Sequence, residues 1–374
     1  MIYLDHAASF PPFSEVLDRV SEVAAEAFGN PGAIHRAGAN ARKILQESRF
    51  ALARLTNVRP EEIFFTSGGT EANNWAIQIA AARPGKHHIV CSAAEHSSIL
   101  KPLRQLEQKG YNVTYLRPDR DGFIHPEQAE AALRQDTAML CVQAVNNETG
   151  VIQDVDALSE VAKRCRVPFF CDAVQSFGHV QQNLHRADLV SLSAHKLGGP
   201  RGVGCLIVRQ PLNPAPLLLG GGQEFGLRSG TENLPGIAGF VLAAELSVHA
   251  LPREQERLQA LCALMEDRLR RIWPGVHFAG EHARRSSILC CRFPGISAEE
   301  MVTRLDQKGV CASPGAACAA RSGEASHVLR AMGFSPEEAA GFVRFSPGPS
   351  TTKADIQTVL SVLEEIYRKG AEPI

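Results

Sequence analysis

Short apolar runs alternate with helical segments over the first half of the chain, and this alternation is the feature that most constrains the fold. The runs are rich in β-branched and aromatic residues, which is typical of buried strands; they lie at 62–66, 88–91, 112–116, 139–145 and 168–171. Helical patterns lie between them, at 67–82, 99–109, 126–133 and 156–165. This order predicts right-handed βαβ units and an α/β fold with a mostly parallel sheet.

The last third of the chain has a different order of elements. A charged helix begins near Pro252, and one strand and two helices follow it, at 288–293, 299–308 and 355–369. A chain of 374 residues is long enough for a large domain and a smaller one. We therefore expect a large α/β domain over residues 15–252 and a small α+β domain formed by residues 1–14 and 253–374.

Composition and net charge are typical of a soluble globular protein. Hydrophobic residues make up 44% of the chain, the formal net charge is -1, and Lys and Arg form no run of the kind that contacts nucleic acid. The first residues lack the basic and apolar regions of a signal peptide, and no apolar run has the length of a membrane span. We expect a cytoplasmic protein without direct contact with nucleic acid or membrane.

Ten cysteines are spread through the chain without the spacing of a disulfide framework. We expect them to be reduced. The absence of a Cys-x-x-Cys pair argues against a structural zinc site, and we expect no metal. Apolar runs contain half of the cysteines and predict that they pack in the core; these are Cys141, Cys171, Cys205, Cys290 and Cys291.

One lysine stands between an apolar run and a glycine-rich turn. The run 190–193 leads through Ala194 and His195 into Lys196, and two glycines follow at 198 and 199. Glycines allow a ligand to approach the backbone closely. Lys196 taken alone is also compatible with a solvated loop lysine. The sequence context favours a lysine that binds pyridoxal phosphate (PLP) as a Schiff base.

A PLP site needs a carboxylate at the pyridine nitrogen, because the protonated ring is the electron sink. Asp172 follows the apolar run 168–171 and so lies at the carboxyl end of a strand, where open α/β sheets bind ligands. Asp172 is equally typical of a helix N-cap, but its pairing with Lys196 favours the cofactor site. Gln175 follows three residues later and is placed to reach the phenolic oxygen of the cofactor.

Three further turns follow strands. In Ser67-Gly-Gly-Thr70, free N–H groups and the helix dipole favour an anion, although such a turn is also ordinary strand-to-helix geometry. His96 would lie over an aromatic cofactor or move protons, and the alternative is a helix-capping or surface histidine. Asn147 would hold a ring oxygen or a substrate carboxylate.

The segment 313–323 consists almost wholly of small residues around Cys318. This composition gives little core packing, and it predicts a movable loop with an exposed thiol of pKa about 8.5. An incidental loop cysteine is the alternative. Arg344 follows in the run 341–346 and is suited to a carboxylate because its guanidinium presents two parallel donors.

Together these motifs resemble the cysteine desulfurases of the class V, fold-type I aminotransferase group. The resemblance extends from Tyr3 to the final helix, and the motifs occur in the family's order. They are Phe28-Gly-Asn-Pro, Thr66-Ser-Gly-Gly-Thr-Glu-Ala-Asn-Asn, Ala94-Glu-His, Val145-Asn-Asn-Glu-Thr-Gly, Cys171-Asp-Ala-Val-Gln-Ser, Ser193-Ala-His-Lys, Arg228-Ser-Gly-Thr-Glu-Asn and Val343-Arg-Phe-Ser.

The resemblance implies a fold-type I PLP-dependent transferase with a sheet of the seven-stranded type. It implies that Lys196 holds PLP and shuttles the α-proton, that Asp172 pairs with the pyridine nitrogen, that His96 stacks on the ring and that Gln175 bonds the phenolic oxygen. The cradle of the cofactor's phosphate would comprise Gly69, Thr70, Ser193, His195 and, from the second subunit of a homodimer, Thr231.

The same resemblance implies a substrate and a nucleophile. Asn147 and Arg344 would receive the carboxylate of L-cysteine, and Cys318 would attack the substrate sulfur to form a persulfide while L-alanine is released. The spacing from Cys318 to Ser326 is that of the long-loop housekeeping and nitrogen-fixation type, which implies sulfur transfer to a separate acceptor or scaffold protein. Two residues depart from the family's pattern, Pro314 in the cysteine segment and Pro349 after the Arg-Phe-Ser motif.

Two alternatives stay open. A class V aminotransferase or a selenocysteine lyase would keep substantial turnover without Cys318. A non-enzymatic sulfur carrier would have an accepting cysteine but no cofactor, and Lys196 with Asp172 argues against it. The destination of the sulfur, whether iron–sulfur clusters, thionucleosides or another thio-cofactor, is also open.

Overall fold

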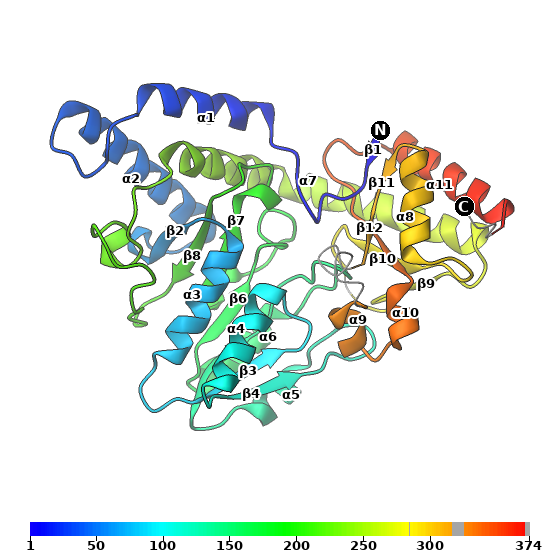
Figure 1. Cartoon of the computed structure of the whole chain (residues 1–374), viewed down its shortest axis with the longest axis horizontal. Helices are drawn as coiled ribbons and strands as arrows, with labels where there is room; N and C mark the ends of the chain where they lie inside the picture. Colours follow the sequence, from blue (N-terminus) through cyan, green and yellow to red (C-terminus); the bar gives the residue numbers. More distant parts are fainter. Residues whose placement is uncertain (284, 316–324, 371–374) are drawn as a thin grey trace.

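The computed structural model describes residues 1–283, 285–315 and 325–370, and its largest element is a seven-stranded sheet (Figure 1). In spatial order the strands are β2 (Ile63–Thr66), β8 (Gly204–Val208), β7 (Leu189–Ser193), β6 (Phe169–Asp172), β5 (Thr137–Cys141), β3 (His88–Ser92) and β4 (Asn112–Leu116). β8 runs antiparallel to both of its neighbours, and the other pairings are parallel. The expected α/β class and mostly parallel sheet are confirmed.

Helices cover both faces of this sheet. One face packs against α3 (Gly69–Ala81) and α4 (Ser97–Gln108), and the other packs against α2 (Arg36–Thr56), α5 (Pro126–Ala132), α6 (Val155–Arg164) and the first half of α7 (Leu234–Ile272). Successive strand residues point to opposite faces. Phe169 accordingly lies in the core under α6, whereas Phe170 lies in the core under α3 and α4.

α7 runs between the two parts of the molecule as one continuous helix, and Pro252 lies inside it. Figure 1 shows it passing from below α1, in the part of the molecule that holds the large sheet, to the right-hand part. By length and mean hydropathy, 1.6 over its most apolar window, α7 is also able to cross a membrane. Residues in the first half of α7, such as Phe240 and Ala244, lie buried in the large core, which identifies α7 as a core helix.

A second core lies around the other half of α7. Its four-stranded sheet has the order β12 (Ser313–Pro314), β13 (Phe342–Phe345), β10 (Leu289–Arg292) and β9 (His277–Phe278), all antiparallel. The helices of this part are α8 (Ala298–Gln307), α9 (His327–Ala331), α10 (Pro336–Ala340) and α11 (Lys353–Arg368). Leu4 from the N-terminus belongs to this core too, because β1 (Ile2–Tyr3) pairs with β11 (Val310–Cys311).

The two cores meet along α7 between Ala244 and Leu258. The domain boundary expected near residue 252 falls in this interval, inside a continuous helix, and as a division into domains it stays a prediction. α1 (Ser14–Glu26) returns the chain from the second core to the large one, where it packs along α7.

The sequence patterns predicted most elements to within two residues, with three exceptions. The expected strand 139–145 begins at Thr137 and ends at Cys141, and the polar residues after it form a loop. α7 begins 18 residues before the charged segment at 252 that indicated a helix. The first residues of the expected loop 313–323 form a strand, because Ser313 and Pro314 pair with β13. All five cysteines expected in the core are buried.

Candidate active site

The candidate site lies at the carboxyl edge of the large sheet, where Lys196 follows the end of β7 by three residues. Lys196 ends a short 3-10 turn, and its Nζ donates hydrogen bonds to the carbonyl oxygens of Ala7 and Ala8, the latter at 3.0 Å. Its own carbonyl oxygen lies 2.7 Å from Nε2 of His179. The lysine is therefore held between the large sheet and the N-terminal segment.

Asp172 is the last residue of β6, the neighbour of β7, and only 6% of its surface is exposed. Its Oδ1 accepts from the N–H of Val174 at 2.9 Å, and its Oδ2 accepts from Nδ2 of Asn73 at 2.7 Å. Gln175 donates from Nε2 to the carbonyl oxygen of Ala7 at 2.7 Å. Ala7 thus accepts from both Gln175 and Lys196, and the parallel strands bring the expected carboxylate and lysine to one edge.

His96 is the N-cap of α4 and stands between β3 and the helix. Its Nδ1 accepts from the main-chain N–H of Ser98 at 3.1 Å, so the capping role that was the alternative for this residue is real. Burial lowers the pKa of His96, and Lys196 acts in the same direction while Asp172 opposes it. His96 is therefore a neutral imidazole at pH 7.

The turn from β2 into α3 forms an anion cradle. Gly68 has φ of +150°, a conformation that favours glycine, and a Cβ at Gly69 would lie 2.8 Å from Cγ2 of Val174. The first N–H groups of α3 have no partner within the helix, and they lie at the positive end of the helix dipole. Thr70 is exposed at the second position of this helix.

Ser193, the last residue of β7, and His195, two residues later, face the same cradle. Cβ of Ser193 lies 3.6 Å from a Cβ placed at Gly69, and its Oγ lies 2.9 Å from Nδ1 of His195. Burial lowers the pKa of His195 to about 4, and the charges of Lys196 and Arg201 act in the same direction. His195 is therefore a neutral hydrogen-bonding group at physiological pH.

Arg344 lies on β13, at the edge of the second core, and is 2% exposed. Its Nη1 donates to the main-chain carbonyl oxygen of Asn147 at 2.8 Å, and its Nη2 lies 2.7 Å from Oδ1 of Asp5. Its buried Nε has no hydrogen-bond partner among the described residues. A buried donor without a partner is costly, and a carboxylate ligand would satisfy it.

Thr231 is the residue that the family resemblance assigns to the second subunit's contribution. It is exposed in the loop between β8 and α7, after Arg228. Arg228 forms a two-pronged ion pair with Glu71 of α3, with N–O distances of 2.7 and 3.1 Å. The loop is thereby tied to the helix that begins at the anion cradle. The contribution of Thr231 across a homodimer stays a prediction.

Cys318 lies outside the described residues. The described residues before and after the cysteine segment contact residues of the candidate site or their neighbours. Ser313 pairs with Arg344 across β12 and β13. Ser326 donates from Oγ to Oε2 of Glu148, the residue after Asn147.

Glu148 is buried, and burial raises its pKa to about 7 although the hydroxyl of Ser326 and the charge of Arg344 oppose the shift. His327 follows Ser326 and contacts the carbonyl oxygen of Glu95 through Nε2 at 2.8 Å. The residues after the cysteine segment therefore contact both the loop of Asn147 and the loop of His96.

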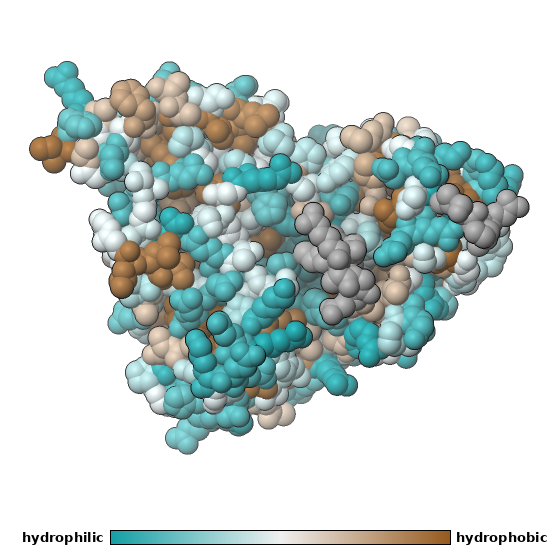
Figure 2. Space-filling view, in the orientation of Figure 1, coloured by the Kyte–Doolittle hydropathy of each residue, from teal (hydrophilic) through white to brown (hydrophobic). Residues whose placement is uncertain are grey.

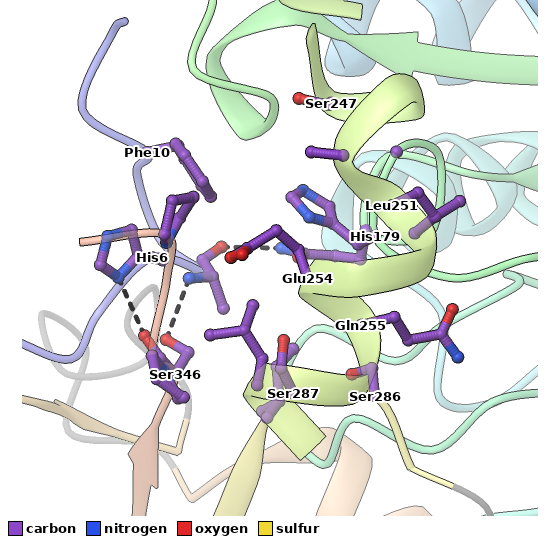
Figure 3. Close-up of a pocket in the computed structure, with 18 of the residues that line it drawn as sticks. His6, Phe10, His179, Ser247, Leu251, Glu254, Gln255, Ser286, Ser287 and Ser346 are labelled. Atoms are coloured by element: carbon purple, nitrogen blue, oxygen red, sulfur yellow. Dashed lines mark hydrogen bonds between the residues drawn. The ribbon is translucent and has the colours of Figure 1, made fainter. Parts of the chain in front are cut away.

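A cavity of about 320 Å³ lies on the other side of the N-terminal segment (Figure 3). Figure 3 shows His6 and Phe10 on one wall and Leu251, Glu254 and Gln255 of α7 on the opposite one. The cavity shares Ala7 and Gln175 with the candidate site. It is a neighbouring space between the two cores rather than the site itself.

Several site residues were not found by sequence reasoning. Asn73 and Ser98 join Asp172 to His96, and Asp5 pairs with Arg344. Asn73 follows Thr70 by three residues, so helical spacing placed it on the face of α3 that begins at the cradle. No local pattern marked Asp5 as the partner of an arginine more than 300 residues away.

Comparison with known proteins agrees with this geometry. The family model Aminotransferase class-V matches residues 2–359. Cysteine desulfurase IscS of Dictyoglomus turgidum is 40% identical over 98% of this chain and 95% of its own length. A solved structure named NifS-like protein is 31% identical with a TM-score of 0.91, covering 98% of this chain and 99% of its own. The structure titled SspA in complex with cysteine is 33% identical with a TM-score of 0.82, over 94% of this chain and all of that one.

The chain therefore belongs to the class-V aminotransferase family, an α/β group whose match here covers the large sheet, the anion cradle and Lys196. Within that family it is one of the cysteine desulfurases, since relatives so named are 36–40% identical to it over nearly its whole length.

The residues present fit PLP. The fit rests on an anion cradle in which a Cβ at Gly69 would clash with Val174, on a buried carboxylate at Asp172 and on a lysine amine at the same sheet edge. The hydrogen-bonded pair of Ser193 and neutral His195 adds a donor for a phosphate. Lys196 would hold the cofactor, and PLP would supply the electron sink that stabilises negative charge at the substrate's Cα.

Proposed function

We propose that this protein converts L-cysteine to L-alanine with PLP as cofactor and retains the sulfur as a persulfide on Cys318. The observation that carries the proposal is the meeting of Lys196 and Asp172 at one sheet edge. Family membership supports it, because relatives across the whole chain are named cysteine desulfurases.

Each side chain has a separate task in this proposal. Lys196 holds the cofactor and then moves the proton at the substrate's Cα. Asp172 keeps the pyridine nitrogen protonated, and its own position is set by the N–H of Val174 and the amide of Asn73. Gln175 lies close enough to Lys196 for both to share one carbonyl acceptor, which supports its place at the phenolic oxygen.

Arg344 binds the substrate carboxylate. Its Nε is buried and unpartnered among the described residues, and its Nη1 is directed by the carbonyl oxygen of Asn147. A substrate carboxylate that accepts from both Nε and Nη2 would give Nε a hydrogen-bond partner and would share Nη2 with Asp5.

Sulfur transfer requires one bond to form and one to break. The thiolate of Cys318 attacks Sγ of the substrate, the new S–S bond forms as the Cβ–Sγ bond breaks, and the electron pair of that bond stays with carbon. Protonation of that carbon and return of the proton to Cα complete L-alanine, and no outside oxidant is needed. Nucleophilic catalysis of this kind depends on the thiolate form of the cysteine.

A homodimer is part of the proposal. Large apolar side chains are exposed on α2, on the turn before it and on the loop between β8 and α7: Phe28, Ile34, Phe50, Leu218, Leu219 and Phe225. Figure 2 shows apolar patches over this end of the molecule. Such patches mark interaction surfaces, and the same loop carries Thr231. Leu219→Glu is expected to give monomers in light scattering, whereas Gln108→Glu on α4 is expected to leave the dimer intact.

The persulfide is passed on to a separate sulfur-acceptor or scaffold protein in the cytoplasm. The long-loop spacing between Cys318 and Ser326 supports this route over direct use of the sulfur. Pro349 is exposed and its carbonyl oxygen accepts from Arg257 at 3.1 Å, so the departure from the family's basic residue removes a charge at the surface near the second core.

One experiment tests the function. Purified protein loaded with PLP is incubated with L-cysteine, alanine is quantified, and intact mass is measured for a sulfur adduct that reducing agent removes. We expect stoichiometric adduct and alanine. Cys318→Ala should abolish both while the cofactor absorbance persists, and Cys165→Ala, at an exposed cysteine elsewhere, should change neither. Substantial alanine release from L-cysteine, or selenium release from L-selenocysteine, by Cys318→Ala would instead identify an aminotransferase-like enzyme or a selenocysteine lyase.

A further inference from the structure

A continuous chain of hydrogen bonds joins Asp172 to His96. Oδ2 of Asp172 lies 2.7 Å from Nδ2 of Asn73, and the same nitrogen lies 2.8 Å from Oγ of Ser98. Oγ of Ser98 lies 2.7 Å from Nδ1 of His96. Asn73 and Ser98 are only 1% and 7% exposed, so water does not compete strongly for these bonds.

The chemistry of the donors determines the direction of each bond. A carboxylate only accepts, so the amide nitrogen of Asn73 faces Asp172 and also donates to Oγ of Ser98. The single hydroxyl hydrogen of Ser98 is then left for Nδ1 of His96. The main-chain N–H of Ser98 donates to the same atom at 3.1 Å. Two donors converge on Nδ1, which therefore carries a lone pair.

We propose that Ser98 and Asn73 are positioning residues that hold His96 as the neutral tautomer with its proton on Nε2. The inference rests on the function proposed above and on the place of His96 over the cofactor ring that the family resemblance implies. The ring then presents a hydrogen-bond donor, not a lone pair, to the cofactor and substrate. Protonation of Nδ1 would require Ser98 to reverse its hydroxyl, and Asn73 Nδ2 has no lone pair to accept that hydrogen.

The charged groups around His96 shift its equilibrium between neutral imidazole and imidazolium. Asp172 favours the imidazolium, whereas Lys196 and His327 disfavour it, and burial lowers the pKa of His96 overall. Glu95, the preceding residue, is fully buried, and burial raises its pKa well above the ordinary value. The donors on Nδ1 and the surrounding charges therefore favour the same neutral ring.

Nitrogen-15 NMR of the histidine rings tests the proposal on the protein without added cofactor. The chemical shifts of wild-type His96 are expected to show a proton on Nε2 and none on Nδ1. Ser98→Ala removes one donor to Nδ1 and should raise the titration midpoint of His96 by about 0.7 pH units, the equivalent of one neutral hydrogen bond. Ser97→Ala, the matched neighbour on α4, should leave the midpoint unchanged.

Activity provides a second and independent readout. His96→Gln carries an amide nitrogen near the position of Nε2, whereas His96→Asn carries one near Nδ1, so the glutamine variant is expected to retain more activity. A wild-type proton on Nδ1, or equal midpoints in Ser98→Ala and Ser97→Ala, would overturn the proposal. Because the NMR measurement needs no turnover, its result is separate from the success or failure of the proposed desulfurase reaction.

Discussion

Arg344 binds Asp5 with 2.7 Å between Nη2 and Oδ1, although 339 positions separate them in the sequence. The pair joins β13 of the second core to the N-terminal segment, and two residues farther along that segment the carbonyl of Ala7 accepts from Lys196. The groups proposed for the substrate carboxylate and for the cofactor are thus attached to one short stretch of chain.

Arg344→Lys tests the two-pronged contact. An ammonium cannot serve the carbonyl oxygen of Asn147, the carboxylate of Asp5 and a substrate carboxylate in one plane. We expect the KM for L-cysteine to rise roughly 10- to 100-fold, the loss of one to two charge-assisted hydrogen bonds, with a smaller change in kcat. Steady-state alanine release measures it, and cofactor absorbance controls for folding. An unchanged KM would remove Arg344 from substrate binding.

Gly69→Ala tests the anion cradle. The added Cβ would lie 2.8 Å from Cγ2 of Val174, closer than such atoms approach in real proteins. We expect PLP to bind about tenfold more weakly, a cost of about 1.4 kcal/mol. The double variant Gly69→Ala with Val174→Ala removes the clash and is expected to recover much of the affinity, as measured by fluorescence titration of the apoprotein. Equal weakening in both variants would mean that the clash with Val174 is not the cause.

Glu224→Ala tests the buried ion pair that supports the loop carrying Thr231. Glu224 accepts from Arg49 at 2.6 and 3.0 Å and from the N–H of Phe65 at 2.8 Å, and both side chains are nearly inaccessible to solvent. Truncation leaves a buried guanidinium without its charge partner and should lower the free energy of unfolding by about 3–5 kcal/mol.

The matched control for Glu224→Ala is a surface pair. Glu364 and Arg368 form an exposed pair one helical turn apart on α11. Glu364→Ala is expected to cost less than about 0.5 kcal/mol, because solvent screens such pairs. Urea denaturation followed by circular dichroism measures both variants. Similar losses in the two variants would contradict the assignment of Glu224 as a buried anchor.

Glu148 predicts a pH dependence of stability. Burial raises its pKa from 4.5 to about 7, so between these two pH values the folded protein binds a proton that the unfolded chain has released. Stability therefore falls as pH rises from about 4.5 to 7, by roughly 3 kcal/mol in total. Glu148→Gln keeps an acceptor for Ser326 and should remove this slope. The measurement is the difference between the unfolding free energies at pH 5 and pH 8. The same difference in the wild type and in the variant would contradict this prediction.

Much of the fold was readable from local pattern. Alternating apolar runs located every strand of the large sheet that precedes Asp172, because side chains of a strand alternate between faces and a buried strand needs apolar residues on both. The start of α7 was missed because Gly236, Gly239 and Pro252 weaken a helical pattern. Tertiary packing overrides these propensities: the apolar half of α7 is held in the large core.

The strand Ser313–Pro314 was read as loop for a related reason. A segment of two residues with small or cyclic side chains shows no hydrophobic periodicity. Proline is tolerated there because the strand lies at the edge of its sheet. The partner strand β13, not the local sequence, gives these residues their conformation.

The sequence by itself determined the elements, the sheet type and the residue types of the site, because hydrophobic periodicity and turn chemistry are local properties of the chain. Lys196, Asp172 and His96 were predicted this way, each at the end of a strand or in the turn after it. Only the tertiary structure decided which groups meet: Arg344 with Asp5, Asn73 with Asp172, and Ser98 with His96. These contacts join separate segments or depend on how a side chain is packed, and the direction of a hydrogen bond follows from the partner that packing supplies.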